Sequence, residues 1–201
     1  ASAEERNTSN GGQQYFFDMS EEVEDHVDRG GRRRRKCDDE GPSARQARVQ
    51  QPCWFCLSNV DVEKYLVVSV GSHCYAAMPK GPLTDGHLMI LPIGHIQSLV
   101  AAPQEVRDDV QRYKEAFTLM FDKQDKVAVV FERNYKTQHL QIQIVPVPKR
   151  CSKALRSSFI NAAQLKNIEM VSMGADQEIW DMVNEGSPYF YVELPEVLEW
   201  P

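Results

Sequence analysis

The sequence contains no apolar run long enough to cross a bilayer. Its first residues, Ala1–Glu5, have neither the basic start nor the apolar stretch of a signal peptide. An excess of positive charge is also absent, because the formal net charge is -6. Proteins that coat nucleic acid non-specifically rely on many Lys and Arg contacts to phosphates, so we expect any nucleic-acid contact to be local. We therefore predict a soluble intracellular protein with no membrane contact. The missing initiator Met indicates a fragment of a longer protein, or processing.

Cysteine is scarce and odd in number, which argues against a disulfide framework. The close pair Cys53-x-x-Cys56 suits a metal or redox role, although the two thiols beside Trp54 and Phe55 could also pack as small apolar groups. A thioredoxin-like role is disfavoured, because no βαβ pattern follows the pair. For Cys74 and Cys151 we expect packing only.

A zinc site needs two further ligands beside the cysteine pair. His26 lies in the predicted linker and His73 in a predicted hairpin turn, which leaves His87, His95 and His139 as candidates. His95 follows an apolar run that ends at Pro92, and His139 begins another apolar segment. A closed structural site would then consist of Cys53, Cys56, His95 and His139.

Residues 1–51 are rich in small polar and charged side chains, a composition that buries too little apolar surface to offset chain entropy. We predict a disordered charged linker here. Its apolar patch, Tyr15-Phe16-Phe17, could dock on a folded surface. The basic run Arg32–Lys36 is compatible with RNA binding, with a nuclear import signal or with a simple solvated charge block.

The composition becomes globular after Pro52. Tyr65–Val70 and Cys74–Met78 flank a Gly-Ser-His turn and predict an antiparallel hairpin. Further strands are expected over residues 86–92, 127–131 and 139–145. A long helix should begin near Pro103, with a buried stripe and a solvent face. A second helix is predicted for 152–165, and Asp176 could cap a short one ending at Val183. The expected helix faces are as follows: Val106, Val110, Tyr113, Phe117 and Met120 buried, and Asp108, Lys114 and Glu115 in water.

The segment His139–Val145 alternates polar and apolar residues. On a strand, alternation sends His139, Gln141 and Gln143 to one face and the aliphatic residues between them to the other. An imidazole followed by two amides supplies uncharged donors and acceptors that suit a phosphate, a base edge or a metal. An edge strand with a polar outer face explains the same pattern. Arg133, Asn134 and Lys136, just before this segment, could add phosphate donors or form a solvated turn.

Taken in order, Cys53-x-x-Cys56, Gly86–Pro92 followed by His95, a long helix and the His139 segment resemble the histidine-triad (HIT) superfamily of nucleotide hydrolases and transferases. Residues 139–148 together with 188–194 resemble more closely the CwfJ family of Cwf-nineteen-like proteins, associated with the spliceosome and with lariat debranching. The resemblance implies an α+β fold, an antiparallel sheet with packed helices. It also implies zinc held by the two cysteines, His95 and His139.

The CwfJ resemblance implies three regions: the linker 1–51, a HIT-like first C-terminal domain over 52–165, and a connector with the truncated start of a second domain over 166–201. The final strand-like run 188–194 is expected to lack partner strands. In this family a metallophosphoesterase-like domain usually lies upstream.

One departure from HIT enzymes decides the expected function. Their middle motif position is a His that attacks the α-phosphate, and here it is Gln141, whose amide is not a usable nucleophile. We therefore predict that the chain has no catalytic residues. We expect Gln141, Gln143 and Asn134 to contact phosphate or RNA, and His87 to have a hydrogen-bonded structural role. The expected function is RNA or partner binding in splicing or intron-lariat turnover, in the nucleus, with spliceosomal proteins and the lariat-debranching enzyme as partners. The alternatives are a residual phosphodiester or nucleotide hydrolase, and a purely structural adaptor.

Overall fold

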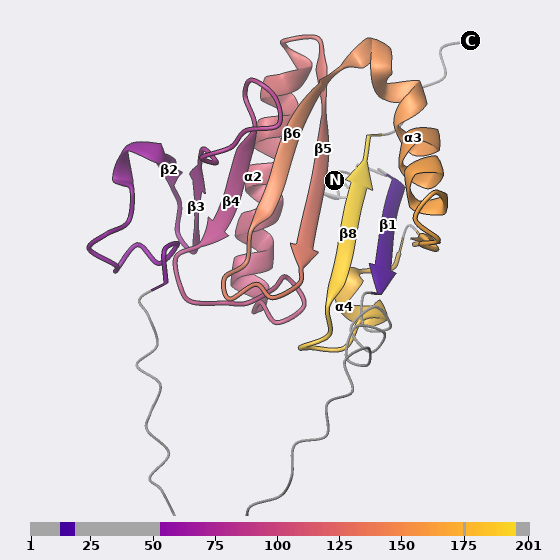
Figure 1. Cartoon of the computed structure of the whole chain (residues 1–201). Coiled ribbons are helices and arrows are strands. Elements are labelled where there is room, and N and C mark those ends of the chain that lie inside the picture. Colours follow the sequence, from indigo (N-terminus) through magenta and orange to yellow (C-terminus); the bar gives the residue numbers. More distant parts are fainter. Residues whose placement is uncertain (1–12, 19–52, 175, 196–201) are drawn as a thin grey trace, which may run out of the picture.

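An antiparallel sheet organises the protein, and helices pack on both of its faces (Figure 1). The computed structural model describes residues 13–18, 53–174 and 176–195. Within them the strand order is β2-β3-β4-β6-β5-β8-β1-β7. This confirms the predicted α+β class. The strands are β1 (Gln13–Asp18), β2 (Val67–Val70), β3 (Cys74–Ala77), β4 (Leu88–Pro92), β5 (Lys126–Asn134), β6 (Ile142–Pro148), β7 (Val171–Ser172) and β8 (Tyr189–Leu194). The helices are α2 (Gln104–Asp122), α3 (Ser152–Gln164) and α4 (Ile179–Met182), with short 3-10 turns at Lys64–Leu66 and Lys149–Cys151.

The β2–β3 hairpin forms where the turn residues predict it. The Gly71 backbone N–H donates to the Cys74 carbonyl at 2.8 Å, which closes the turn. A Cβ at Gly71 would stand 3.0 Å from Asp109 Oδ2, so the close approach of α2 favours glycine here. Asp109 itself is buried and accepts from the backbone N–H groups of His73 and Cys74 at 2.9 and 2.8 Å. The hairpin is thereby attached to α2.

Helix α2 and α4 cover one face of the sheet, which we call the closed face. Apolar residues of α2, β3, β4, β5, β6 and β8 form the largest core cluster there. The predicted α2 stripe is confirmed for Val106, Val110 and Phe117, whereas Met120 is 37% exposed and Phe121 is buried in its place. Lys114, expected in water, instead forms a half-buried ion pair with Glu193 of β8 at 2.6 Å. These differences arise because α2 crosses the C-terminal strand as well as its sequence neighbours.

The opposite face, which we call the open face, is covered only at its two sides. Helix α3 packs Leu155 and Phe159 over β5, β8 and β1. The loop that carries the cysteine pair packs Phe55 and Leu57 over β3 and β4. Between α3 and the cysteine loop this face of the sheet is not covered by a helix or loop of the described residues, and the site described below lies there.

The strand that contains the HIT-like motif begins later than predicted. β6 starts at Ile142, so His139 and Gln141 belong to the loop that leads into it. The alternation still holds, because Leu140, Ile142 and Ile144 are at most 1% exposed, whereas Gln141 and Gln143 are only partly buried. The loop departs from strand pairing because the Leu140 N–H donates to the Ile96 carbonyl of another loop, at 2.6 Å.

Two other expectations are corrected by the sheet. Residues 13–18, placed in the predicted linker, form β1 between β8 and β7, so the backbone of this segment joins the sheet, and Tyr15 is buried. The remainder of 1–51 lies outside the described residues. Strand β8 does not lack partners, since it pairs with β5 on one side and β1 on the other. The division of the chain into family domains stays a prediction.

The short helix α4 begins differently from the prediction. Its N-cap is Glu178, which forms a capping box with Asp181. Asp176 lies in the turn before it and is exposed. In the described part of the chain, no helix is both long and apolar enough to cross a membrane.

Candidate metal and ligand site

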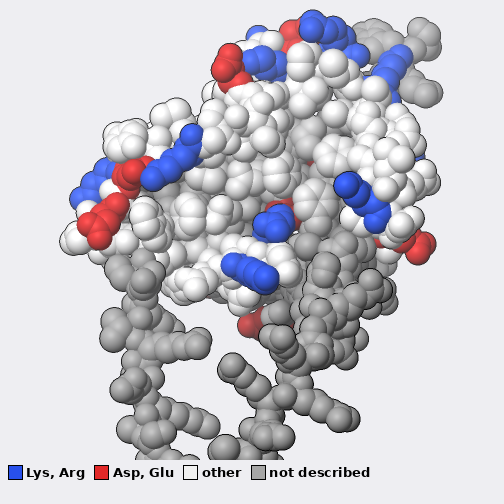
Figure 2. Space-filling view, viewed as in Figure 1, with Lys and Arg blue, Asp and Glu red and all other residues white. Residues whose placement is uncertain are grey.

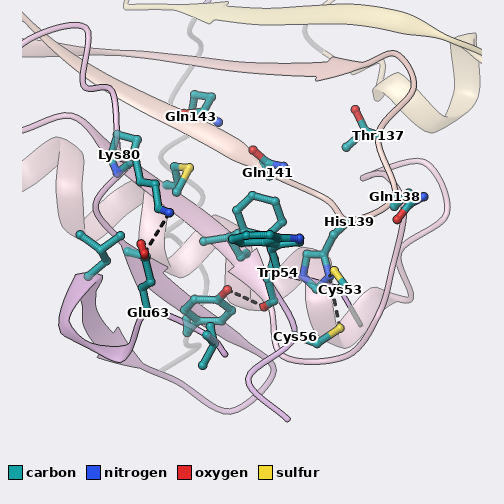
Figure 3. Close-up of a pocket in the computed structure, with 18 of the residues that line it drawn as sticks. Cys53, Trp54, Cys56, Glu63, Lys80, Thr137, Gln138, His139, Gln141 and Gln143 are labelled. Carbon is teal, nitrogen blue, oxygen red and sulfur yellow. Dashed lines mark hydrogen bonds and ion pairs between the residues drawn. The ribbon is translucent and has the colours of Figure 1, made fainter. Parts of the chain in front are cut away.

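The four residues predicted to bind zinc lie together at one end of the open face. Figure 3 shows three of them, Cys53, Cys56 and His139. The ligand atoms of Cys53, Cys56, His95 and His139 are all within 4.8 Å of one another. A turn brings the two cysteines together, with the Cys56 N–H donating to the Cys53 carbonyl at 3.3 Å, and the Asn59 amide donates to the same carbonyl at 3.0 Å. Loops that follow β4 and β5 bring the two histidines to this turn.

His139 has the hydrogen-bond pattern of a metal ligand. Its Nε2 lies 2.9 Å from the Pro92 carbonyl oxygen, which can only accept, so Nε2 carries the proton. In the neutral ring Nδ1 is then unprotonated, and it lies 3.5 Å from Cys53 Sγ and 3.7 Å from Cys56 Sγ. A carbonyl that fixes the imidazole in this way is the usual support of a ligating histidine. The ring is 1% exposed, and burial lowers its pKa, which favours this neutral form.

The spacing of the cluster also fits a tetrahedral ion. Zinc bonds of about 2.3 Å to sulfur and 2.1 Å to nitrogen place neighbouring ligands about 3.6 Å apart. His95 Nδ1 lies 3.3 Å from Cys56 Sγ, and the distances from His139 are close to the same value. Burial and then the neighbouring Cys53 raise the pKa of the Cys56 thiol. A bound cation would offset both effects, because thiolates are the form that binds metals.

A groove of about 1700 Å³ runs from this cluster along the open face. Its floor consists of sheet residues that include Met89, Leu91 and Gln143. Gln141, which immediately precedes β6, also lines the groove (Figure 3). Trp54, Lys80 and Glu63 stand on the side of the cysteine loop. On the opposite side the groove is lined by Phe131, Arg133, Tyr135 and Lys136.

Gln143 presents an amide donor to the groove. The Leu83 backbone N–H donates to His87 Nδ1 at 3.0 Å, so the proton of this imidazole is on Nε2. His87 Nε2 therefore donates to Gln143 Oε1, at 2.8 Å, and the NH₂ group of Gln143 is left facing the groove. Burial lowers the pKa of His87, although the Gln143 bond opposes this effect. The predicted structural role of His87 agrees with these contacts.

The predicted phosphate contacts do not all lie in the groove. Gln141 and Gln143 line it, and so do Arg133 and Lys136. Asn134 is 3% exposed, and its amide donates to the Ser187 carbonyl at 2.9 Å, next to β8. This corrects its assignment, because alternation along β5 turns Asn134 away from its neighbours Arg133 and Tyr135.

Sequence reasoning missed Trp54 and Lys80. In the sequence Trp54 was noted only as a neighbour of the cysteine pair, yet its side chain is 68% exposed. Lys80 Nζ lies 5.5 Å from the centroid of the Trp54 ring and 2.9 Å from Glu63 Oε1. No local signal identifies these residues, because the folded hairpin and the cysteine loop bring them together.

Comparisons with known proteins support the assignment of the chain to the CwfJ family. It is 55% identical over 185 residues to CWF19-like protein 1 homolog of Caenorhabditis elegans, covering 92% of this chain and 34% of that protein. It is 42% identical to CWF19-like protein 1 of Mus musculus, covering 90% of this chain and 34% of the relative. Zinc finger CCCH domain-containing protein 59 of Oryza sativa is 36% identical, over 79% of this chain and 27% of that protein. The chain thus spans about a third of the length of these relatives. The family model described as "Protein similar to CwfJ C-terminal" matches residues 40–160, and the chain belongs to this family.

Proposed function

We propose that this chain is a non-catalytic RNA-binding module that acts in pre-mRNA splicing or intron-lariat turnover. The observation that carries the proposal is the polar row formed by Gln141 and Gln143 in the groove, in which Gln141 stands where HIT enzymes carry the attacking imidazole. Amides can bind phosphate and base edges, but they cannot attack phosphorus. Membership of the CwfJ family supports the splicing context. A nuclear location, and spliceosomal proteins and the lariat-debranching enzyme as partners, are further parts of the proposal.

The two buried histidines near the groove support a non-catalytic role. Both ring nitrogens of His139 are directed at the cysteines and the Pro92 carbonyl. Both nitrogens of His87 are engaged, by Leu83 and Gln143. A general acid or base needs a nitrogen within hydrogen-bond reach of the substrate. Neither imidazole meets this condition without breaking an existing contact.

We further propose that Cys53, Cys56, His95 and His139 hold one structural zinc ion. The fixed tautomer of His139 and the ligand spacing support it. A bound zinc would join three segments that are far apart in the sequence, and it would thereby fix one end of the groove.

RNA binding is tested with the complete chain and a fluorescein-labelled branched RNA or its linear counterpart, by fluorescence anisotropy. Gln143→Ala should weaken binding roughly five-fold or more, because an amide donor to phosphate is lost, and Gln141→Ala should act in the same direction. Gln111→Ala is the matched control, since Gln111 is exposed on α2, on the closed face. Unchanged affinity in both groove variants would refute the site. Turnover of nucleotide substrates by the purified chain would refute the non-catalytic assignment.

The metal is tested by elemental analysis of protein purified without chelators. We expect one zinc ion per chain, lost in Cys53→Ser and retained in Cys151→Ser, whose half-buried cysteine lies outside the cluster. Absence of metal from the unaltered protein, or its retention in Cys53→Ser, would contradict the four-ligand site.

A further inference from the structure

Trp54 is a large aromatic side chain that the fold holds in solvent. Its neighbours in sequence are fixed: Cys53 and Cys56 belong to the metal cluster, and the Phe55 carbonyl accepts from Tyr75 Oη at 2.6 Å. The Phe55 ring packs on the sheet and lies 5.9 Å from the His139 ring. Because Phe55 points inward, Trp54 points outward over the groove (Figure 3). An exposed tryptophan on an anchored loop contributes little to the core and is typical of a binding surface.

The charges around the groove are arranged asymmetrically. Beside Trp54 the charge of Lys80 is offset by Glu63, and Asp61 also lines this side. On the other side Arg133 and Lys136 are exposed, and no salt bridge to either is found among the described residues. In Figure 2, which has the orientation of Figure 1, the middle of the visible surface is mostly uncharged, with basic side chains near its centre. A phosphate is therefore favoured near Arg133 and Lys136, and an uncharged group near Trp54.

We propose that Trp54 is a stacking platform for an unpaired base of single-stranded RNA, whose adjoining phosphates lie toward Gln143, Arg133 and Lys136. Each nucleotide presents an uncharged aromatic base and an anionic backbone, which matches the two sides of the groove. Base stacking on tryptophan tolerates any sequence, so this subsite binds single strands in general. The proposal rests on the RNA-binding function above and adds the part of the RNA that is recognised.

The position of Trp54 between the two cysteines also connects the platform to the metal cluster. Without the metal, the turn that bears Trp54 would lose the cross-link between Cys53, Cys56 and the two histidines. Loss of metal should therefore weaken RNA binding, even though none of the four ligands has to touch RNA.

The test measures anisotropy of labelled oligouridylate and oligoadenylate with the unaltered chain, Trp54→Ala, Trp54→Phe and a control. Trp54→Ala should weaken the binding of both RNAs roughly ten-fold, equal to about 1.4 kcal/mol of binding free energy, and Trp54→Phe should recover much of this loss. Tyr65→Ala is the control, because Tyr65 is 74% exposed and lies outside the groove lining. Zinc content and circular dichroism verify that each variant is folded and loaded.

A second readout distinguishes stacking from a general loss of affinity. RNA with a 2-aminopurine base should lose fluorescence when it binds the unaltered chain at saturation, and should lose less when it saturates Trp54→Ala. If the unaltered chain binds RNA and Trp54→Ala binds equally well, the stacking platform is refuted while the proposed function stands. If the unaltered chain binds branched RNA but neither single-stranded oligonucleotide, the stacking platform is refuted while the proposed function stands. If it binds none of these RNAs, both are refuted.

Discussion

The two faces of the sheet use alternate residues of one segment for different purposes. On the closed face, Leu140, Ile142 and Ile144 join the core beneath α2. On the open face, His139 joins the metal cluster, and Gln141 and Gln143 line the groove. A residue and its sequence neighbour are therefore under different constraints, the first from packing and the second from ligand binding. Substitutions at adjacent positions should separate stability from binding.

The largest effect should come from the closed face. Ile144→Ala leaves a cavity in a position that is 0% exposed, and we expect the free energy of unfolding to fall by about 2–5 kcal/mol in urea titrations. Gln143→Ala should lower it by only about 1 kcal/mol, since water in the groove can replace the bond to His87. Equal losses in the two variants would contradict the division between the faces.

A carboxyl group within the closed face should make stability depend on pH. Glu132 is 2% exposed, and burial raises its pKa to about 7, although hydrogen bonds from Tyr189 and Leu99 favour the charged form. The pKa in the unfolded chain is near 4.5, so between these values the folded state binds more protons. The contribution of Glu132 to stability is therefore present in full below about pH 4.5 and is lost as pH rises through about 7, by about 3 kcal/mol in total.

The matched variant is Glu132→Gln, which keeps an acceptor for the Leu99 N–H and cannot ionise. Denaturant titrations at several pH values should show that this part of the pH dependence disappears in the variant. A parallel pH dependence in both proteins would contradict the assigned pKa.

A smaller loss is expected where α2 anchors the β2–β3 hairpin. Asp109→Ala removes the acceptor of the His73 and Cys74 N–H groups and should lower the free energy of unfolding by about 2 kcal/mol. The exposed neighbour Asp108 provides the control, because Asp108→Ala should change it by less than about 0.5 kcal/mol. Thermal unfolding followed by circular dichroism measures both, and similar values would show that the hairpin is held by other contacts.

The smallest effect on stability should be that of Gln141→Ala. The side chain is partly exposed in the groove, and its loss should leave the urea midpoint unchanged within error while RNA affinity falls. A clear destabilisation by this variant would mean that Gln141 supports the fold, and that the open face is not specialised for binding.

Local patterns predicted most elements, because period and turn chemistry act over a few residues. The Gly71 turn, the run ending at Pro92 and the helix after Pro103 all appear where expected. Predictions failed where a distant segment intervened. Asn134 faces Ser187, Lys114 pairs with Glu193, and β1 joins β8, all through the C-terminal strand. No window of sequence contains both members of these pairs.

The sequence by itself determined the alternation of residues 139–145, the metal-ligand types and the absence of an imidazole at Gln141, because these depend on side-chain chemistry and on a period of two. The tertiary structure decided which atoms meet. The Pro92 carbonyl selects the tautomer of His139, Leu83 directs the donor of Gln143 into the groove through His87, and the inward Phe55 leaves Trp54 in solvent. Each of these outcomes requires a hydrogen bond or packing contact made only after β3, β4 and β6 have assembled.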